Sequence, residues 1–556
     1  MHPRGSLYCA YNLEYDAAAI LAFLGHASLE SIAFLCWRKH GNWSIRYIRG
    51  KELIIRNRLT KVSHRFYDTF PFYQVSLDRA SAKIFGASSK IAIPKEWYLD
   101  FASVLRGPDR LRALEYCAED ARTCHRLQAH VARSFLAAGF VFSRPLSPGY
   151  IASQKLKGRV PRTSNELFGR SYYGGRVEIW KRGRLGPVSV YDIRSAYPAA
   201  LRSCRIPLPS RPVMTYSPLA AYGSYLCRVR ASFPALPWRS GDSEMLYYPI
   251  GEWHEWYSRP HVELARECGI RLDILAGYEC DASDILVPEI EEMYTLRKSK
   301  PEYDIAYKLV LNSLYGKLAA RIPRYIDADG AIRRVERVEG RLLERIDTYG
   351  STTCLAVAAH VTATTQATLV RAARHAPDRV IALMTDGLVV QGRDPLPLDL
   401  SPSLGAWDCE QWDDSVFVGA GIYALHSREK NPKTGAAWGW KSKYRGFSAR
   451  TSLPELLAAE TKDTWISVPA LRGRSLMQAA RAHDFSSLNS LEEIRQRKNV
   501  NADSKRAWKS EFSRASDTLV KSSESYPLTV IESAEESIAR LSAQGRLPRN
   551  MRELIK

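Results

Sequence analysis

The sequence lacks several features that would assign a chain of this size to other classes. Its ten cysteines are scattered, and no two of them form a C-x-x-C pair. This distribution argues against a zinc site or a disulfide framework, and it is typical of a reducing compartment such as the cytoplasm. No internal repeat or low-complexity tract is visible. The first residues also lack the continuous apolar core of a secretory signal, so none is expected.

Long apolar runs are scarce as well. The longest stretch without a charged residue, 351–370, is full of threonine and small residues. It predicts a packed internal helix rather than a membrane span. We therefore expect no membrane partner and a cytoplasmic location.

Negative charge is in short supply. The chain has 59 Asp and Glu residues against 80 Lys and Arg residues, a net charge of +21, and its sequence pI is about 9.5. This balance favours a polyanionic partner, most simply nucleic acid, although a merely soluble basic surface is the alternative. A length of 556 residues exceeds what one core needs, so several domains are expected.

One stretch places a carboxylate where a buried strand ends. Residues 188–191 are apolar or small and predict a strand; Asp192 follows, then a turn with Ser195 that leads into a helix. A carboxylate at such a point in a basic protein can hold a divalent metal against a phosphate. A turn or helix-cap role is the alternative.

A second stretch, 308–317, predicts a helix with a polar face. Lys308, Asn312 and Tyr315 are spaced i, i+4 and i+7, so a cation, an amide and an aromatic hydroxyl share that face. This combination suits a nucleoside triphosphate. The alternative is a solvated face with an Asp304–Lys308 pair.

A third stretch predicts a hairpin. Two apolar runs, 380–384 and 388–390, flank Asp386-Gly387, and Asp-Gly is a strong hairpin signal. The turn would lift the Asp386 carboxylate out of the sheet. A simple turn residue is the alternative.

Together these stretches resemble motifs A, B and C of the family B DNA polymerases. Motif A is Asp192 to Pro198, and motif B matches at every fixed position from Lys308 to Gly316. Only the Thr-Asp core of motif C survives, with the family's metal ligand falling on Asp386. Met384 stands where the family keeps its first Asp, which is not the main ligand.

The resemblance implies template-directed DNA synthesis from dNTPs with two Mg²⁺ ions, for which Mn²⁺ can substitute. Asp192 and Asp386 would be the catalytic metal ligands, with the Ile193 carbonyl as a further ligand. Ser195 would contact the priming strand. The incoming nucleotide would be bound by Tyr197, Arg297, Lys308, Asn312 and Tyr315.

Two further stretches resemble DNA-contacting motifs of the protein-primed members. Residues 172–175 fit the Tyr-x-Gly-Gly template motif, where Tyr172, Gly174, Gly175 and Arg176 would contact DNA; a glycine turn before a strand is the alternative. Residues 438–447 lie where the family keeps Lys-x-Tyr, although Lys443 adjoins Tyr444 directly. The contacts expected there, at primer phosphates, are Lys441, Lys443, Tyr444 and Arg445.

The first 145 residues resemble a 3′–5′ proofreading exonuclease. Asn12 with Asp16 fits its second motif, and Tyr116 with Asp120 fits its third. The first motif, an Asp-x-Glu on a strand, is missing, because residues 1–11 contain no Asp or Glu. A two-metal nuclease needs carboxylates on both sides of its metals, so we expect a degenerate or N-terminally incomplete exonuclease. Asp68 is a weaker candidate as a substitute ligand.

The fold class expected from this resemblance is a multidomain α/β and α+β protein, with an RNase H-like exonuclease-type domain followed by a right-hand polymerase. Strands are expected at 7–11, 226–232 and 270–278, and helices at 17–24, 111–138 and 256–268. The expected domains are an exonuclease-like domain at 1–145, a connector at 146–185, palm at 186–296 and 351–440, fingers at 297–320 and a largely helical thumb at 441–556. Residues 321–350 predict a hairpin with an Asp329-Gly330 turn at its centre, which would aid processivity; a surface hairpin with no such role is the alternative.

The partners implied are template and primer DNA, dNTPs and a terminal protein. The terminal protein would bind to an insertion in the 186–296 region. If the chain is viral, the location implied is the host cytoplasm. Two other priming modes stay open, primer-independent synthesis and an ordinary nucleic-acid primer. A reading from another class also stays open, in which a decayed polymerase serves as a DNA-binding scaffold.

Overall fold

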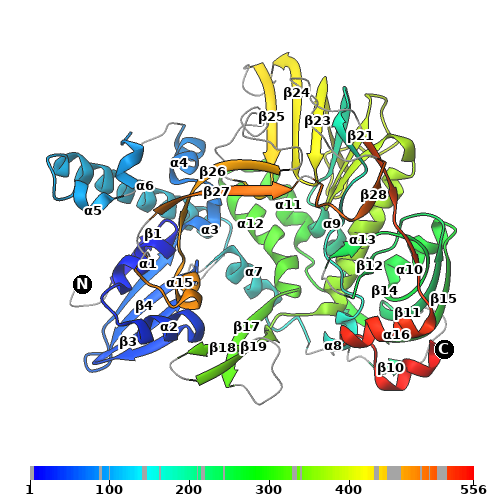
Figure 1. Ribbon diagram of the computed structural model, residues 1–556, viewed down its shortest axis with the longest axis horizontal. Helices are drawn as coiled ribbons and strands as arrows, with labels where there is room; N and C mark the ends of the chain where they lie inside the picture. The colour runs from blue at the N-terminus through cyan, green and yellow to red at the C-terminus, as the bar shows by residue number, and fades with distance from the viewer. Residues whose placement is uncertain are drawn as a thin grey trace. The chain divides into compact units, whose positions relative to one another are not determined.

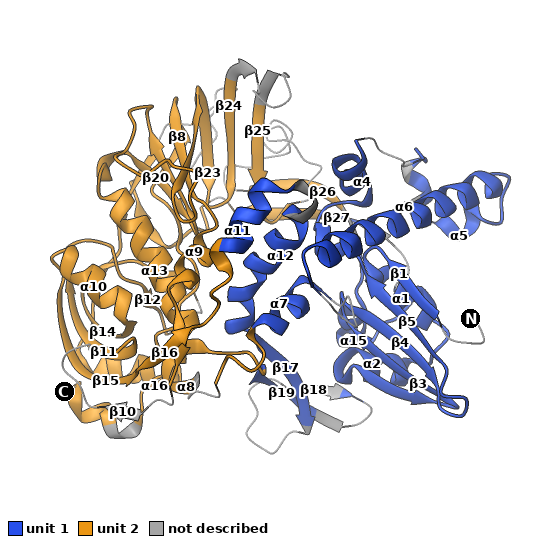
Figure 2. Ribbon diagram, turned by 180° about the vertical axis from the view of Figure 1, so that it is seen from behind, with its two compact units in different colours: residues 1–155, 292–350, 471–494 blue, residues 156–291, 351–470, 495–556 orange. Residues whose placement is uncertain are grey.

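The computed structural model forms two compact units, which Figure 2 colours separately. Unit 1 comprises residues 1–155, 292–350 and 471–494, and unit 2 comprises 156–291, 351–470 and 495–556. The structure describes residues 6–86, 91–98, 100–140, 147–161, 165–208, 211–213, 220–241, 245–327, 335–338, 341–430, 437–447, 465–486, 488, 491–499, 501–509 and 523–555.

Unit 1 contains a five-stranded sheet of order β1-β5-β4-β3-β2. β1 (Ser6–Ala10) pairs in parallel with β5 (Ser63–Asp68), while β4 (Glu52–Asn57), β3 (Trp43–Ile48) and β2 (Trp37–His40) follow antiparallel. α1 (Leu13–Leu21) and α2 (His26–Leu35) lie beside β3 and β4 in Figure 1. Leu13, Ala17 and Leu21, one helical face of α1, are buried in the core they share with this sheet. The strand expected at 7–11 is thus confirmed, whereas the helix expected at 17–24 begins four residues earlier, at Leu13, and ends at Leu21.

The long helix of unit 1 is α6 (Arg110–Ala137), which confirms the helix expected at 111–138. It packs against α12 (Pro301–Leu318), the helix that carries motif B. At its end, the hydroxyl of Tyr307 donates to the Ala138 carbonyl at 3.4 Å, and its ring lies 5.9 Å from that of Phe140. Further helical segments of unit 1 include α3 (Phe70–Tyr73), α4 (Leu77–Phe85), η1 (Lys95–Tyr98), α5 (Phe101–Val104) and α15 (Leu476–Ala482).

The expected hairpin at 321–350 is a three-stranded sheet. β17 (Arg321–Asp327) and β18 (Val335–Val338) both pair antiparallel with β19 (Arg341–Tyr349). The Asp329-Gly330 turn expected at its centre lies outside the described residues. The ring of Tyr325 contacts Phe34 of α2 at 5.1 Å, so this sheet packs within unit 1.

Unit 2 is built on the antiparallel sheet that carries motifs A and C, of order β22-β8-β21-β20-β6. Its strands are β6 (Val177–Ile179), β8 (Val188–Ile193), β20 (Val380–Met384), β21 (Gly387–Gln391) and β22 (Trp407–Trp412). α13 (Leu355–Ala373) packs on one face through Leu369 and Ala372. Almost all of its residues are buried, so the packed internal helix expected at 351–370 is confirmed.

A six-stranded sheet of order β25-β24-β23-β7-β29-β28 covers the other face. β23 (Asp414–Gly419), β24 (Ile422–Lys430) and β25 (Ala437–Tyr444) lie side by side in Figure 1. Phe417 and Tyr423 from these strands pack against Val190 and Val389 of the motif sheet. The remaining strands of this sheet are β7 (Lys181–Arg184), β28 (Arg506–Trp508) and β29 (Ser523–Pro527).

A third sheet, of order β10-β15-β11-β14-β30, corrects one helix prediction. Trp256 lies in β14 (Ile250–Ser258), where its indole is fully buried, and helix α10 (Arg259–Glu267) begins only afterwards, with Pro260 in its first turn. The strands expected at 226–232 and 270–278 are confirmed as parts of β11 (Tyr222–Ala231) and β15 (Arg271–Cys280). The other strands are β10 (Arg211–Val213) and β30 (Thr529–Ile531).

The largely helical character predicted for 441–556 is wrong for the described residues. They contain β26 (Trp465–Gly473), β27 (Leu491–Asn499) and β28 to β30, while their longest helix is α16 (Ala534–Ala543). Ile466, Val468 and Ala470, at alternate positions of β26, are buried, as is Ser467 between them.

Shorter elements make up the rest of the described fold. They are α7 (Pro148–Leu156), α8 (Asn165–Gly169), α9 (Ala196–Arg202), β9 (Arg205–Pro207), β12 (Trp238–Arg239), β13 (Leu246–Tyr247), β16 (Ala282–Ile285), α11 (Ile290–Ser299), η2 (Pro377–Arg379) and η3 (Arg549–Leu554). None of the helices in the described part of the chain has the length and apolar character needed to cross a membrane.

Candidate active site

The register of the motif sheet aligns five residues across five strands. Met384 lies opposite Gly387, Gly387 opposite Asp192, and Asp192 opposite Asp408, while Val177 pairs with Met384 on the outer side. Residues directly opposite in a ladder present their side chains on the same face. This cross-strand row therefore joins two carboxylates at one end to two apolar side chains at the other, with Gly387 between them.

A backbone hydrogen bond at the turn between β20 and β21 joins motif C to motif A. The Asp386 N–H donates to the Met384 carbonyl at 2.7 Å, and the Ile193 N–H donates to the Asp386 carbonyl at 2.9 Å. Thr385 has φ +64°, which is strained for a β-branched residue. These bonds place Asp386 beside the end of β8, one residue from Asp192.

The role expected for Gly387 needs correction. The central residues of the turn are Thr385 and Asp386, and Gly387 begins β21 without a positive φ. Its missing side chain has another use, because an ideal Cβ there would lie 2.6 Å from Asp192 Oδ1. Gly387 makes room for the motif A carboxylate.

The two carboxylates have raised pKa values. Burial is the main cause for Asp192, and the charge of Asp386 raises its pKa further, whereas Lys443 lowers it. Burial also raises the pKa of Asp386, against its own backbone N–H and Lys443. Partly buried like charges favour a bound cation, and carboxylate oxygens are the donors that Mg²⁺ prefers. The residues present therefore fit the expected metal.

Lys443 lowers the pKa of both Asp192 and Asp386. Burial lowers its pKa, but Tyr423, Asp192 and Asp386 raise it more, so the net pKa is above the usual value. It lies opposite Tyr423 in the β24–β25 ladder, with its Nζ 5.7 Å from the Tyr423 ring centre. Two strands of another sheet thus bring a protonated lysine to the carboxylates.

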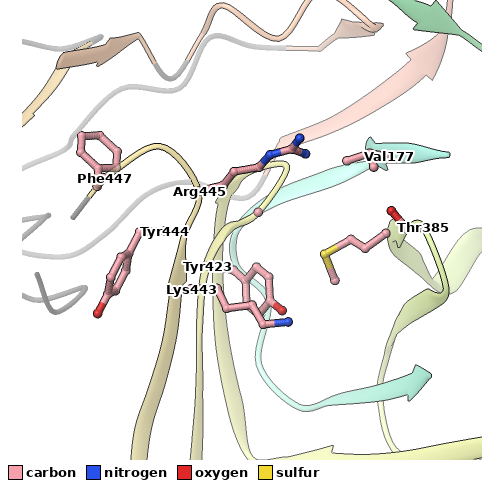
Figure 3. A pocket seen from close by; sticks show the side chains of 9 residues that line it. Val177, Thr385, Tyr423, Lys443, Tyr444, Arg445 and Phe447 are labelled. Atoms are coloured by element: carbon pink, nitrogen blue, oxygen red, sulfur yellow. The ribbon is translucent and has the colours of Figure 1, made fainter. Parts of the chain in front are cut away.

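A pocket of about 450 Å³ adjoins the motif C turn (Figure 3). In Figure 3, Lys443 and Tyr423 lie side by side, with Thr385 and Val177 across the pocket from Tyr444 and Phe447. The lining residues are Val177, Met384, Thr385, Gly421, Tyr423, Lys443, Tyr444, Arg445 and Phe447. Of the expected primer contacts, Lys443, Tyr444 and Arg445 line it, while Lys441 pairs with Glu410 at 2.9 Å.

The Tyr-x-Gly-Gly stretch meets motifs A and C at Gly175. An ideal Cβ on Gly175 would lie 2.7 Å from Thr385 Cγ2 and 3.1 Å from the Tyr197 hydroxyl. Burial raises the pKa of Tyr197 to about 12, with Asp386 and Tyr172 adding to it. Tyr197 therefore stays protonated beside Asp386. Ser195 precedes it as the N-cap of α9, with φ +52°.

Buried polar side chains fix this stretch in place. Gln366 Nε2 donates to the Gly174 carbonyl at 2.5 Å, and Gln366 Oε1 lies 3.1 Å from His261 Nε2. Arg546 donates to the Tyr173 hydroxyl at 2.7 Å. Neither His261 nor Arg546 stands out in the sequence, because the partners they meet are about 100 and 370 residues away.

Arg176 does not fit the expected contact with DNA. Its side chain is 1% exposed and ion-paired with Glu178 at 2.6 Å. It also donates to the Pro234 carbonyl at 2.8 Å and stacks 3.9 Å from the Tyr248 ring centre. Its backbone carbonyl accepts from the Thr385 N–H at 2.6 Å, so Arg176 supports the motif C turn from within the core.

Motif B lies on α12 in unit 1. Lys308 and Asn312 are exposed and Tyr315 is half-buried, in the spacing expected of one face. Burial lowers the pKa of Lys308, and the nearby charges of Lys83 and Arg297 lower it further. Asp304, the alternative partner of Lys308, accepts from Arg297 at 3.0 Å.

In the exonuclease-like region, Asp68 is 1% exposed and serves the backbone. Its Oδ1 accepts from the Asn12 N–H at 2.8 Å and the Phe70 N–H at 3.0 Å. Burial raises the pKa of Asp16, and Asp68 adds to that shift, so these two carboxylates lie near one another. Tyr116 and Asp120 are half-buried on α6, one turn apart. Among the residues described, no three or more His, Cys, Asp or Glu form a group that could hold a metal.

Comparisons with known proteins agree with these motifs. Residues 160–328 match the family model of DNA polymerase type B, organellar and viral. A DNA-directed DNA polymerase of Enterobacteria phage PRD1 is 25% identical over 425 residues, covering 69% of this chain and 71% of the phage protein. A probable DNA polymerase of Neurospora intermedia is 26% identical over 167 residues, 26% of this chain and 17% of that protein.

The fold is also that of a solved polymerase. Phi29 DNA polymerase complexed with primer-template DNA and incoming nucleotides superposes with a TM-score of 0.63 at 16% identity, covering 89% of this chain and 91% of that one. The likeness shows a multidomain α/β polymerase fold. The family match over residues 160–328 and the phage relative make this chain similar to the DNA polymerases of type B, organellar and viral.

Proposed function

We propose that this family B DNA polymerase extends a primer by two-metal nucleotidyl transfer, with Asp192 and Asp386 as the carboxylate ligands. The observation that carries the proposal is the hydrogen bond from the Ile193 N–H to the Asp386 carbonyl, which holds both motifs together at the same end of neighbouring strands. Burial is the largest cause of the raised pKa of Asp192, and the charge of Asp386 is the second, so the two carboxylates interact electrostatically. Bound Mg²⁺ would activate the primer hydroxyl and neutralise the triphosphate and the leaving pyrophosphate. The Ile193 carbonyl remains a proposed further ligand.

The chain's own residues would orient the substrates. Lys443, kept protonated by its neighbours, would balance phosphate charge beside the carboxylates. Tyr197, packed against Gly175, would lie under the sugar of the incoming dNTP. By the family resemblance, Lys308 and Asn312 would bind the triphosphate, with Arg297 at its phosphates and Tyr315 at the base pair.

We assign the domains by the same resemblance. Residues 1–145 would be the exonuclease-like domain and 146–185 the connector, with palm at 186–296 and 351–440. Fingers would be 297–320 and the thumb 441–556. The mixed sheet of unit 1 supports the exonuclease-like domain, and the motif sheet of unit 2 supports the palm.

Protein priming is the proposed way to start synthesis, with a terminal protein bound near 186–296 and the sheet at 321–350 aiding processivity. The test is whether the first nucleotide stays covalently attached to a protein. Synthesis that starts with labelled dNTP and yields only free nucleic acid would favour the primer-independent or nucleic-acid-primed modes.

Primer extension by Asp192→Asn tests the metal role. We expect extension to be lost and DNA binding to stay near wild type, because the fold does not need that charge. Glu267→Gln, which alters an exposed ion pair with Arg371 in the same unit, is the matched control. Loss of DNA binding along with extension would contradict the metal role. Tight binding without extension by the wild type would favour the scaffold reading.

A further inference from the structure

Met384 and Val177 give the pocket beside motif C an apolar wall. Met384 and Val177 occupy the apolar end of the cross-strand row, on the same face as Asp192. Met384 packs against the cluster that contains Phe417 and Tyr423, and both Met384 and Tyr423 line the pocket. A family B polymerase with the usual motif would place a carboxylate at this position.

Two polar side chains that line this pocket, Lys443 and Thr385, have neighbours within the chain. Lys443 interacts with Tyr423 and with both carboxylates. The Thr385 side chain lies at Gly175, with Oγ1 3.2 Å from the position of an ideal Cβ there. A ligand group that touches Met384 therefore meets a thioether and hydrocarbon, which are poor hydrogen-bond partners.

The position of the carboxylates indicates which ligand group this is. A strand being extended must bring its terminal 3′-hydroxyl to Asp192 and Asp386, so its last sugar lies beside them. The pocket continues from Thr385, next to Asp386, and carries Lys443 and Arg445 for phosphates and Tyr423 and Tyr444 for stacking. Met384, two residues from Asp386, is the apolar lining residue nearest to it in the chain.

We propose that Met384 makes the site select primer strands that end in deoxyribose. The inference rests on the proposed polymerase function and adds the identity of the primer's terminal sugar. The 2′-hydroxyl of a ribose sits one carbon from the reacting 3′-hydroxyl and would be buried against Met384 without a partner. A buried hydroxyl without a hydrogen bond weakens binding by roughly 5- to 150-fold.

The test compares two DNA primers that differ only in a deoxyribose or a ribose at the 3′ end. Each protein is assayed on both primers with the same template, Mg²⁺ and dNTPs, so the ratio of extension rates is independent of how much of a variant is folded. Met384→Gln, close to Met in size, supplies a partner for the hydroxyl, and Met384→Leu keeps the wall apolar.

We expect the wild type and Met384→Leu to prefer the deoxyribose primer by roughly 5- to 150-fold, and Met384→Gln to lose most of that preference. Equal use of both primers by the wild type, or equal preference in the Gln and Leu variants, would overturn the inference while leaving the polymerase function intact. Failure of the wild type to extend either primer would instead overturn the proposed function.

Discussion

Gly387→Ala would test the geometry of the carboxylate pair without touching a charged residue. The added Cβ would lie 2.6 Å from Asp192 Oδ1, and contacts below 3.0 Å do not persist. The carboxylate must therefore retreat by roughly 0.4 Å to reach 3.0 Å and by roughly 0.8 Å to reach the 3.4 Å of an ordinary contact. Gly387 has no positive φ, so alanine suits its backbone. A carboxyl group turns easily, and we expect stability to change by less than about 1 kcal/mol.

The cost should fall on the reaction instead. Catalytic groups must be held within about 0.5 Å of the productive geometry, and a displacement of about 1 Å costs on the order of 100-fold in rate. We therefore expect single-turnover primer extension to slow by about 10- to 100-fold, with DNA affinity and melting temperature near wild type. Gly419→Ala is the matched control, because its Cβ would meet nothing within 4 Å. Equal rates for the two variants would refute the reasoning.

Two other predictions concern acid stability and nuclease activity. Burial lowers the pKa of His261 and of His360 to about 4. In the unfolded chain the pKa of histidine is about 6.5, so below that pH the unfolded state binds more protons than the folded state. Each of the two histidines should therefore lower the free energy of unfolding by about 2 kcal/mol at pH 5. Thermal unfolding at pH 7.5 and 5.0 measures the loss, and an unchanged melting temperature would contradict the burial of these rings. In a second assay, Mg²⁺-dependent 3′ trimming should be absent, since Asp68 Oδ1 is engaged by the backbone of Asn12 and Phe70; trimming that Asp120→Ala abolishes would show an active exonuclease.

Local patterns predicted the elements that carry the motifs. The strand before Asp192, the hairpin at Asp386 and the motif B helix follow from hydrophobic period and turn residues within a few positions. Residues 351–370 were predictable as a buried helix because this segment carries small and apolar side chains on all of its faces.

Long-range pairing could not be predicted in this way. Gly387 lies opposite Asp192 across almost 200 residues of chain, and Lys443 lies opposite Tyr423 in a different sheet, so neither neighbour leaves a local signal. Arg176 looked like a DNA contact because it follows two glycines, but a buried glutamate two residues later holds it in the core. In the C-terminal region, β27 was hidden by its many charged residues.

The most direct test is primer extension on a templated oligonucleotide with Mg²⁺ and dNTPs, with wild type and Asp386→Asn side by side and DNA binding measured for both. We predict extension by the wild type alone with similar binding, which would mean that motif C works with Asp386 as its single carboxylate. Extension by Asp386→Asn at the wild-type rate would contradict the central claim that Asp192 and Asp386 form the catalytic pair.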